Sequence, residues 1–159
     1  MLKSLRLIIL FSTFFISCFA KAGTGVGEWR THFSYNNVNQ VVVTDSKVFA
    51  VASGKLFSYD NNNKSLETYS SLTGLNGFEV LFIDWSEQEK VLMIVYSDGN
   101  IDFLNDQGIL NLPDFKNKSL TADKVVNNLR IDGRFAYMLT GVGMIVVDLR
   151  NKEIKATLS

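Results

Sequence analysis

The chain has 159 residues with 16 basic and 16 acidic side chains, so its formal net charge at neutral pH is zero. This balance argues against nucleic acid or an anionic membrane surface as a partner, because both attract clustered positive charge. One cysteine and one histidine supply neither a disulfide framework nor a zinc site, so we expect no metal and no cofactor.

The first 22 residues have the pattern of a secretory signal peptide. A positively charged start leads into an apolar run, 7–19, and Ala20-Lys21-Ala22 supplies the small residues of a cleavage site. The apolar run is short for a retained membrane anchor. We therefore expect cleavage between Ala22 and Gly23, followed by export of the mature chain.

Cys18 leaves a second interpretation of this segment open. Ser17-Cys18 resembles part of a bacterial lipidation motif, although Phe15 stands where that motif usually has leucine. The other interpretation is that Cys18 is an ordinary signal-peptide residue. In that case the mature chain contains no cysteine and depends on its apolar core for stability.

After the signal segment, short apolar runs alternate with clusters of Gly, Asn, Asp and Ser. No stretch longer than about ten residues shows the apolar period of a helix, and this favours an all-β protein. One hairpin pattern occurs three times, at 48–60, 91–105 and 135–148, with a glycine-containing turn between two apolar segments. The copies end at Asp60, Asn105 and Asp148.

A recurrence of about 44 residues with several strands in each unit is typical of β-propeller blades. The expected strands, in chain order, are 40–44, 47–52, 55–59 and 65–70; 80–85, 90–96, 100–104 and 109–112; and 127–132, 134–139, 144–149 and 153–158. The second strands are apolar at nearly every position, as expected where neighbouring blades cover both faces of a sheet. We expect an open arc of three blades to leave one face of the first and of the third blade uncovered. A β-sandwich and a Greek-key barrel are the alternatives, but neither explains the recurring hairpin.

These strands predict a signal peptide at 1–22 and an incomplete propeller at 23–159, with blades at about 38–72, 78–114 and 125–159. Residues 28–33 resemble an outer strand and are a candidate for closing a ring. Propellers have four to eight blades, so three cannot close a ring. We expect either a piece of a longer protein or association with further blades.

Catalytic groups are scarce in this sequence. His32 is the sole histidine, and we interpret it as a strand residue rather than a member of a catalytic triad. Asp98, Asp102 and Asp106 recur every four residues, which is not the spacing of a calcium loop, so we expect them in turns and facing solvent. Trp29, Phe82 and Trp85 are interpreted as core residues rather than as a platform for a sugar.

Ligands of propellers often gather on the face formed by the loops between second and third strands and between successive blades. In this chain those loops are 53–55, 97–100, 140–143, 71–78 and 115–123. The candidate contact residues on this face are Ser53, Gly54, Asp98, Gly99, Asn100, Gly141 and Gly143.

Residues 69–80 resemble the propeller repeat of two-component regulators, although Met93-Ile94-Val95-Tyr96 replaces that repeat's Trp-Ile-Gly-Thr element. A wider resemblance is to the first propeller of PorZ-like proteins of the type IX secretion system. The stretches that carry it are 28–32 with 35–37, 56–60, 95–102, 136–137 and 140–143.

The PorZ-like resemblance implies a seven-bladed first propeller, a second propeller and a C-terminal β-sandwich. It also implies export to the outer-membrane surface and membership of an attachment complex that contains a sortase and associated outer-membrane proteins. The implied role is a non-enzymatic scaffold that helps to supply anionic lipopolysaccharide to secreted cargo. The alternative is the periplasmic, glycan-sensing propeller of a hybrid two-component regulator. An enzyme built on a propeller is disfavoured because acid–base groups are scarce.

Overall fold

The computed structural model describes residues 35–119 and 124–159, which belong to one compact unit, Thr31–Ser159. The expected signal peptide with its cleavage site and Cys18 lies outside the described residues. The candidate closing strand, 28–33, with Trp29 and His32, also lies outside them.

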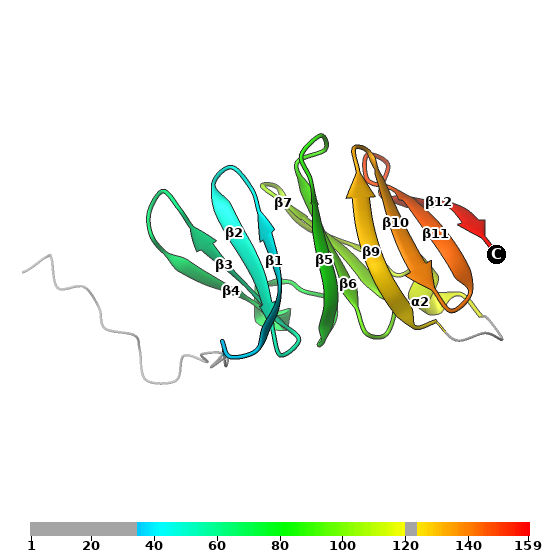
Figure 1. The fold of residues 1–159 in the computed structure, drawn as a ribbon, viewed down its shortest axis with the longest axis horizontal. Coiled ribbons are helices and arrows are strands. Elements are labelled where there is room, and N and C mark those ends of the chain that lie inside the picture. The colour runs from blue at the N-terminus through cyan, green and yellow to red at the C-terminus, as the bar shows by residue number, and fades with distance from the viewer. Residues whose placement is uncertain (1–34, 120–123) are drawn as a thin grey trace, which may run out of the picture. The chain divides into compact units, whose positions relative to one another are not determined.

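The described residues form three four-stranded antiparallel sheets, each a meander in which consecutive strands are neighbours (Figure 1). The strands are β1 (Val38–Val43), β2 (Lys47–Ala52), β3 (Lys55–Asp60) and β4 (Leu66–Tyr69) in blade 1; β5 (Val80–Ser86), β6 (Val91–Tyr96), β7 (Ile101–Asn105) and β8 (Gly108–Leu112) in blade 2; and β9 (Val126–Asp132), β10 (Phe135–Thr140), β11 (Gly143–Asp148) and β12 (Glu153–Leu158) in blade 3.

Two short helical turns, η2 (Ser71–Thr73) and α2 (Asp114–Asn117), lie in the connections between blades. The prediction of an all-β fold with an incomplete set of propeller blades is confirmed. Each expected strand overlaps an observed one, and their ends differ by at most two residues.

Blade 2 lies between the other two blades, and its inner strand β5 contacts both β1 and β9. All six residues of β6 are buried. Because side chains alternate along a strand, Leu92 and Ile94 pack toward blade 1, whereas Met93 and Val95 pack toward blade 3. The unbroken apolar run of this strand is therefore explained by two cores, one on each face.

The second strand of blade 3 is less covered than β6. In β10, Ala136 and Met138 are buried against blade 2, but Tyr137 is half-buried and Leu139 is 46% exposed. Tyr137 and Leu139 lie on the face of β10 opposite blade 2, where the described residues place no blade, as the sequence predicts for an outer blade of an open arc.

Each inner strand carries a β-bulge near its start, which leaves one residue without a partner on the second strand. The bulged residues are Asn39, Leu81 and Asn127. A bulge increases the local twist of a strand, and its return at one position shows that the three blades share a backbone plan.

Side chains of the inner strands bond to the backbone of the next blade. The amide of Gln40 donates to Leu81 O at 2.6 Å and accepts from Ile83 N at 2.9 Å. In the same way, Asp84 Oδ2 accepts from Ile131 N at 2.8 Å. These bonds set the position of each blade along its neighbour.

The residue that ends each repeated hairpin caps the following turn. Asp60 Oδ1 accepts from Asn62 N at 2.8 Å, Asn105 Oδ1 from Gln107 N at 2.9 Å, and Asp148 Oδ1 from Arg150 N at 3.0 Å. A short side-chain oxygen at this position forms an Asx turn. This explains why the repeat ends in Asp or Asn.

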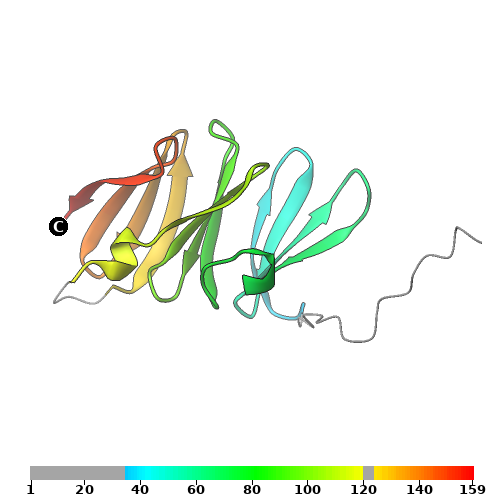
Figure 2. The same ribbon diagram turned by 180° about the vertical axis from the view of Figure 1, so that it is seen from behind.

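The loops of the unit gather at two ends of the strands (Figures 1 and 2). The connection face, lowermost in both figures, holds the loops 53–54, 97–100 and 141–142 together with the connections 70–79 and 113–119. The turn face, at the opposite end, holds the turns 44–46, 61–65, 87–90, 106–107, 133–134 and 149–152.

Candidate interaction face

The connection face is held together by a contact that recurs in each blade. The loop between the second and third strands bonds to the residue that leads into the inner strand of the same blade. The pairs are Ser53 Oγ to Asn36 O at 3.4 Å, Ser97 N to Glu79 O at 3.0 Å and Gly141 N to Val125 O at 3.0 Å. The three candidate loops therefore occupy equivalent places.

The loops themselves are not identical. The first has two residues, Ser53 and Gly54, both with positive φ, at 48° and 72°. Such a pair is typical of the primed turns that suit the twist of a hairpin. The second loop has four residues, 97–100, and its third residue, Gly99, has φ 78°. Each of these two turns therefore needs a left-handed residue at a different place.

The candidate contact residues divide by exposure. Ser53, Asp98 and Gly141 are exposed, and Gly54 and Gly143 are half-buried. Gly99 and Asn100 are buried: a side chain on Gly99 would stand 3.0 Å from the Phe115 ring. These two residues support the face from inside and are not available for direct contact with a partner.

Asp98 carries the charge of its loop. Its Oδ2 atom pairs with Lys116 Nζ, from α2, at 2.8 Å, and its Oδ1 atom accepts from Asn100 N at 3.0 Å. Partial burial opposes ionisation of Asp98, but the ammonium group and the backbone N–H outweigh it and lower the pKa of this carboxyl below its ordinary value.

A buried carboxylate lies beneath the connection face. Asp102 is 0% exposed, and it accepts hydrogen bonds from the Tyr96 hydroxyl at 2.6 Å, Asn76 N at 2.8 Å and Asn111 Nδ2 at 2.8 Å. The expectation that Asp102 faces solvent is wrong. The donors come from β6, β8 and the blade 1–2 connection, and the sequence alone does not bring these together.

The donors that reach Asp102 are all uncharged. Burial, followed by the hydrogen bond and the charge of Asp102, raises the pKa of Tyr96 far above its ordinary range, so the hydroxyl remains a donor. Asn100 Nδ2 donates to Asn76 O at 2.9 Å and extends the network. The network attaches residue 76 of the connection to the core of blade 2.

The blade 1–2 connection is ordered along its whole length. Ser70 and Thr73 form a capping box around η2, and Gly74 ends the turn with φ 105°. Leu75 is buried in the core between blades 1 and 2. Gly77 lies against the ring of Tyr96, because a Cβ atom there would stand 2.3 Å from that ring.

Two apolar side chains of this connection point outward. Phe78 is 85% exposed and Leu72 is 70% exposed. Beside Phe78 lies a hollow of about 140 Å³, whose apolar lining residues include Leu56, Leu75 and Val80. The loop 71–78 was predicted to lie on the interaction face, but Leu72 and Phe78 were not named as contact residues. An available signal was the occurrence of these two apolar residues among Ser, Thr, Gly and Asn.

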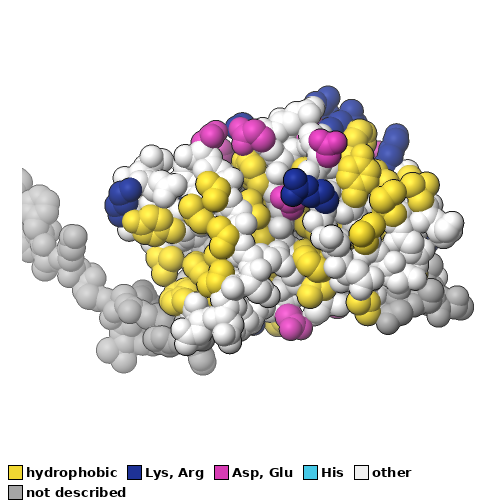
Figure 3. Space-filling view, in the orientation of Figure 1, with side chains coloured by type: hydrophobic (Ala, Val, Ile, Leu, Met, Phe, Trp, Pro, Cys, Tyr) yellow, Lys and Arg dark blue, Asp and Glu magenta, His cyan; other side chains and the backbone are white. Residues whose placement is uncertain are grey.

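The turn face differs from the connection face because it carries more charged side chains and ion pairs. Figure 3 shows most of the visible charged side chains near this end of the strands. Arg150 pairs with Glu89 at 2.8 Å between blades 3 and 2, and Lys90 pairs with Asp45 at 3.2 Å between blades 2 and 1. Ion pairs across the blade boundaries therefore concentrate here.

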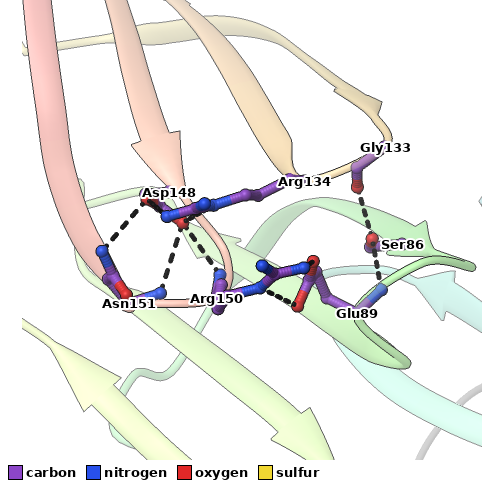
Figure 4. Close-up of polar contacts among 7 residues, drawn as sticks. All are labelled: Ser86, Glu89, Gly133, Arg134, Asp148, Arg150 and Asn151. Atoms are coloured by element: carbon purple, nitrogen blue, oxygen red, sulfur yellow. Dashed lines mark hydrogen bonds and ion pairs between the residues drawn. The ribbon is translucent and has the colours of Figure 1, made fainter.

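A second buried carboxylate lies on the turn face (Figure 4). Asp148 is 0% exposed, and its Oδ1 atom accepts from Arg134 Nε at 2.8 Å, while its Oδ2 atom pairs with the Arg134 guanidinium. The bond from Arg134 and those from the turn backbone at 150 and 151 outweigh burial and lower the pKa of Asp148 to about 2.

Ser86 links blades 2 and 3 beside this cluster (Figure 4). Its hydroxyl donates to Gly133 O at 2.5 Å and accepts from Glu89 N at 3.1 Å. Phe82 and Trp85, from the same strand, are half-buried and pack against the two cores, as the sequence predicts.

The described part of the chain contains neither a cluster of metal ligands nor a membrane-spanning helix. No group of three His, Cys, Asp or Glu side chains there could hold a metal ion. Among residues 35–119 and 124–159, no helix has both the length and the apolar character needed to cross a membrane.

Repeated four-stranded meanders, joined through their inner strands, define the class of this protein as a β-propeller. The family described as "TSS9, PorZ, N-terminal beta-propeller domain" matches residues 48–159. The chain belongs to this family, and the resemblance stated from the sequence is confirmed.

Solved structures agree with this assignment. PorZ of Porphyromonas gingivalis, described as an essential bacterial surface component of the type-IX secretion system, is 36% identical with a TM-score of 0.77. The similarity covers 82% of this chain and 18% of PorZ, so the chain spans under a fifth of that protein's length. No curated protein matches the chain.

More distant structures share the fold alone. The extracellular domain of BT4673 from B. thetaiotaomicron is 14% identical with a TM-score of 0.62, over 82% of this chain and 18% of that one. AztD of Citrobacter koseri is 11% identical with a TM-score of 0.57, and the similarity covers 77% of this chain and 34% of AztD. At these identities neither protein indicates a ligand.

Proposed function

We propose that this chain contributes propeller blades to a surface component of a type IX secretion system, and that it acts by binding other proteins rather than by catalysis. The observation that carries the proposal is the 36% identity to PorZ over 82% of the chain. The family match over residues 48–159 supports it. Other propellers share the architecture at 11–14% identity but not this degree of sequence similarity.

In finer detail, the proposed role is that of a scaffold in an attachment complex. Its proposed partners are a sortase and associated outer-membrane proteins, and its contribution is linked to the delivery of anionic lipopolysaccharide to the sortase. The proposed location is the outer-membrane surface, reached after cleavage between Ala22 and Gly23. The proposed organisation is a signal peptide at 1–22 and a partial propeller at 23–159.

The test is deletion of the gene in a host that encodes both this protein and a type IX system, followed by complementation. We expect cargo proteins to lose their attachment to the cell surface and their lipopolysaccharide modification, and to regain both on complementation. The readouts are immunoblots of cell-surface and medium fractions and co-purification of the sortase. Normal attachment of cargo in the deletion strain would contradict the proposal.

Export is tested separately by mass spectrometry of the protein recovered from the cell envelope. A mature N-terminus at Gly23 is the expected result. A mature N-terminus at a lipidated Cys18 would support the alternative interpretation of the leader, and an intact Met1 would contradict export by cleavage.

A further inference from the structure

The connection between blades 1 and 2 carries the two most exposed large apolar side chains of the described residues, Phe78 at 85% and Leu72 at 70%. Single apolar residues on a surface need no explanation, but an exposed aromatic ring beside a hollow is a feature of binding sites. The hollow of about 140 Å³ adjoins Phe78, and Leu56, Leu75 and Val80 supply its apolar walls.

The backbone around Phe78 is fixed on both sides. Phe78 O accepts from Lys55 Nζ at 3.0 Å, and Val80 N donates to Gly54 O at 2.9 Å. On the other side, Asn76 N and Nδ2 donate to the buried Asp102 carboxylate at 2.8 and 3.1 Å. A side chain on a backbone held in this way loses little further freedom when a partner covers it, which favours binding.

The size of the hollow limits what can enter it. Sites for small molecules enclose roughly 300–1,000 Å³, so a volume of about 140 Å³ suits one amino-acid side chain better than an oligosaccharide or a lipid chain. The paired geometry of a projecting ring and an adjacent hollow suits a partner that has a pocket and a projecting side chain of its own.

The charge around the hollow points the same way. Glu79 is the only charged residue from 70 to 80, and Lys55, which also lines the hollow, is bonded to Phe78 O. One charge of each sign gives no field that would attract an anionic lipid headgroup, which clustered basic residues recognise. An uncharged, apolar protein surface is the occupant that fits these observations.

We propose that Phe78 and the adjacent hollow form a docking site for a protein loop that inserts one apolar side chain and receives the Phe78 ring. This proposal rests on the proposed function, in which the propeller acts by contact with other proteins. It adds the place of contact and the chemistry of the partner's surface. Buried aromatic anchors often dominate the affinity of such contacts.

The test is performed on the full-length protein in its native cell envelope, with Phe78→Ser as the variant. We expect co-purification of the sortase-containing complex to fall roughly 30-fold, as for the loss of an aromatic anchor, while the melting temperature stays unchanged. Leu110→Ser is the matched control, because Leu110 is 50% exposed on β8, away from the hollow. This control should keep the complex intact.

A photo-crosslinking residue at position 78 identifies the neighbour directly. Crosslinks to a component of the complex, absent when the crosslinker is at position 110, would support the proposal. Crosslinks only within the same polypeptide would overturn it. Unchanged co-purification of the complex with the Phe78→Ser variant would also overturn it. The proposal would also be overturned if Phe78→Ser weakened binding to purified lipopolysaccharide but left binding to the protein complex unchanged.

The two proposals fail in different ways. If gene deletion abolishes cargo attachment but Phe78→Ser has no effect on complex formation, the docking site is wrong and the proposed function stands. If gene deletion leaves cargo attachment unchanged, the proposed function fails, whatever the effect of Phe78→Ser on complex formation.

Discussion

Asp102 and Asp148 are both fully buried carboxylates, but they lie at opposite ends of the blades and have different partners. Asp102, beneath the connection face, is held by a tyrosine hydroxyl, side-chain amides and a backbone N–H. Asp148, on the turn face, is held by Arg134 and by its own turn. The first fixes a segment between blades, whereas the second closes a turn within one blade.

This difference shows how the two faces are used. Uncharged donors need exact placement, so the Asp102 network fixes the connection that presents Phe78. The ion pairs that join blades at the turn face, Lys90 with Asp45 and Arg150 with Glu89, involve partly exposed side chains and contribute modestly. We therefore expect substitutions at the connection face to affect stability more than those at the turn face.

The largest effect is expected from Asp102→Ala. Removal of the acceptor leaves the buried Tyr96 hydroxyl without a partner, frees Asn76 N and removes one of the bonds of the Asn111 amide, which together cost about 3 kcal/mol of unfolding free energy. Urea unfolding measures the change. Asp106→Ala, at an exposed turn position, is the control and should change it by less than about 0.5 kcal/mol. Equal losses for both variants would refute the role given to Asp102.

Gly77→Ala should have the next largest effect. The added methyl group would stand 2.3 Å from the Tyr96 ring, so the ring or the connection must move, at about 2 kcal/mol. Ser71→Ala, an exposed change in the same connection, serves as the comparison. Thermal denaturation of both variants shows whether close packing at Gly77 is the cause, and an unchanged melting temperature for Gly77→Ala would exclude it.

The charge of Asp148 should appear in the pH dependence of stability. Its folded pKa, about 2, is below the ordinary value near 4, so the ionised form favours folding. This contribution is present above pH 4 and is lost as the pH falls from about 4 toward 2. Asp148→Asn keeps an acceptor for the turn, but it should flatten the plot of unfolding free energy against pH between about pH 4 and 2. Urea unfolding at several pH values measures this plot. An unaltered slope would contradict it.

Ser86→Ala tests the contact between blades 2 and 3 at the turn face. Loss of the bonds to Gly133 O and Glu89 N should cost about 1 kcal/mol, because both groups are then left less well satisfied. Ser97→Ala removes an exposed hydroxyl at the connection face and is the control. Chemical denaturation distinguishes the two, and a larger loss for Ser97→Ala would reverse the interpretation.

The smallest effect is expected from Lys90→Gln. Lys90 pairs with Asp45 and Glu87, but all three side chains are more than half exposed, so the change should be at most about 0.5 kcal/mol. The difference from the unaltered protein should shrink further in 1 M salt, where exposed charges are screened. A salt-independent loss above 2 kcal/mol would show that the turn face holds the blades together more strongly than proposed.

Much of the fold was predictable because its signals are local. The alternation of apolar segments with Gly, Asn and Asp specifies hairpins, and the return of Asp60, Asn105 and Asp148 reflects an Asx turn formed within a few residues. The candidate site was predicted less well. Gly99 and Asn100 belong to a turn in sequence, but Phe115 and Asn76 bury them from elsewhere in the chain.

The sequence by itself determined the strands, the turns and their repetition as blades, because each depends on backbone preferences and side-chain alternation over a few residues. Only the tertiary structure decided which polar residues are buried and which apolar ones are exposed. Asp102 accepts hydrogen bonds from Asn76, Tyr96 and Asn111. Phe78 remains exposed because hydrogen bonds fix the backbone around it. Such contacts join residues distant in sequence, and their energy depends on burial that no local pattern records.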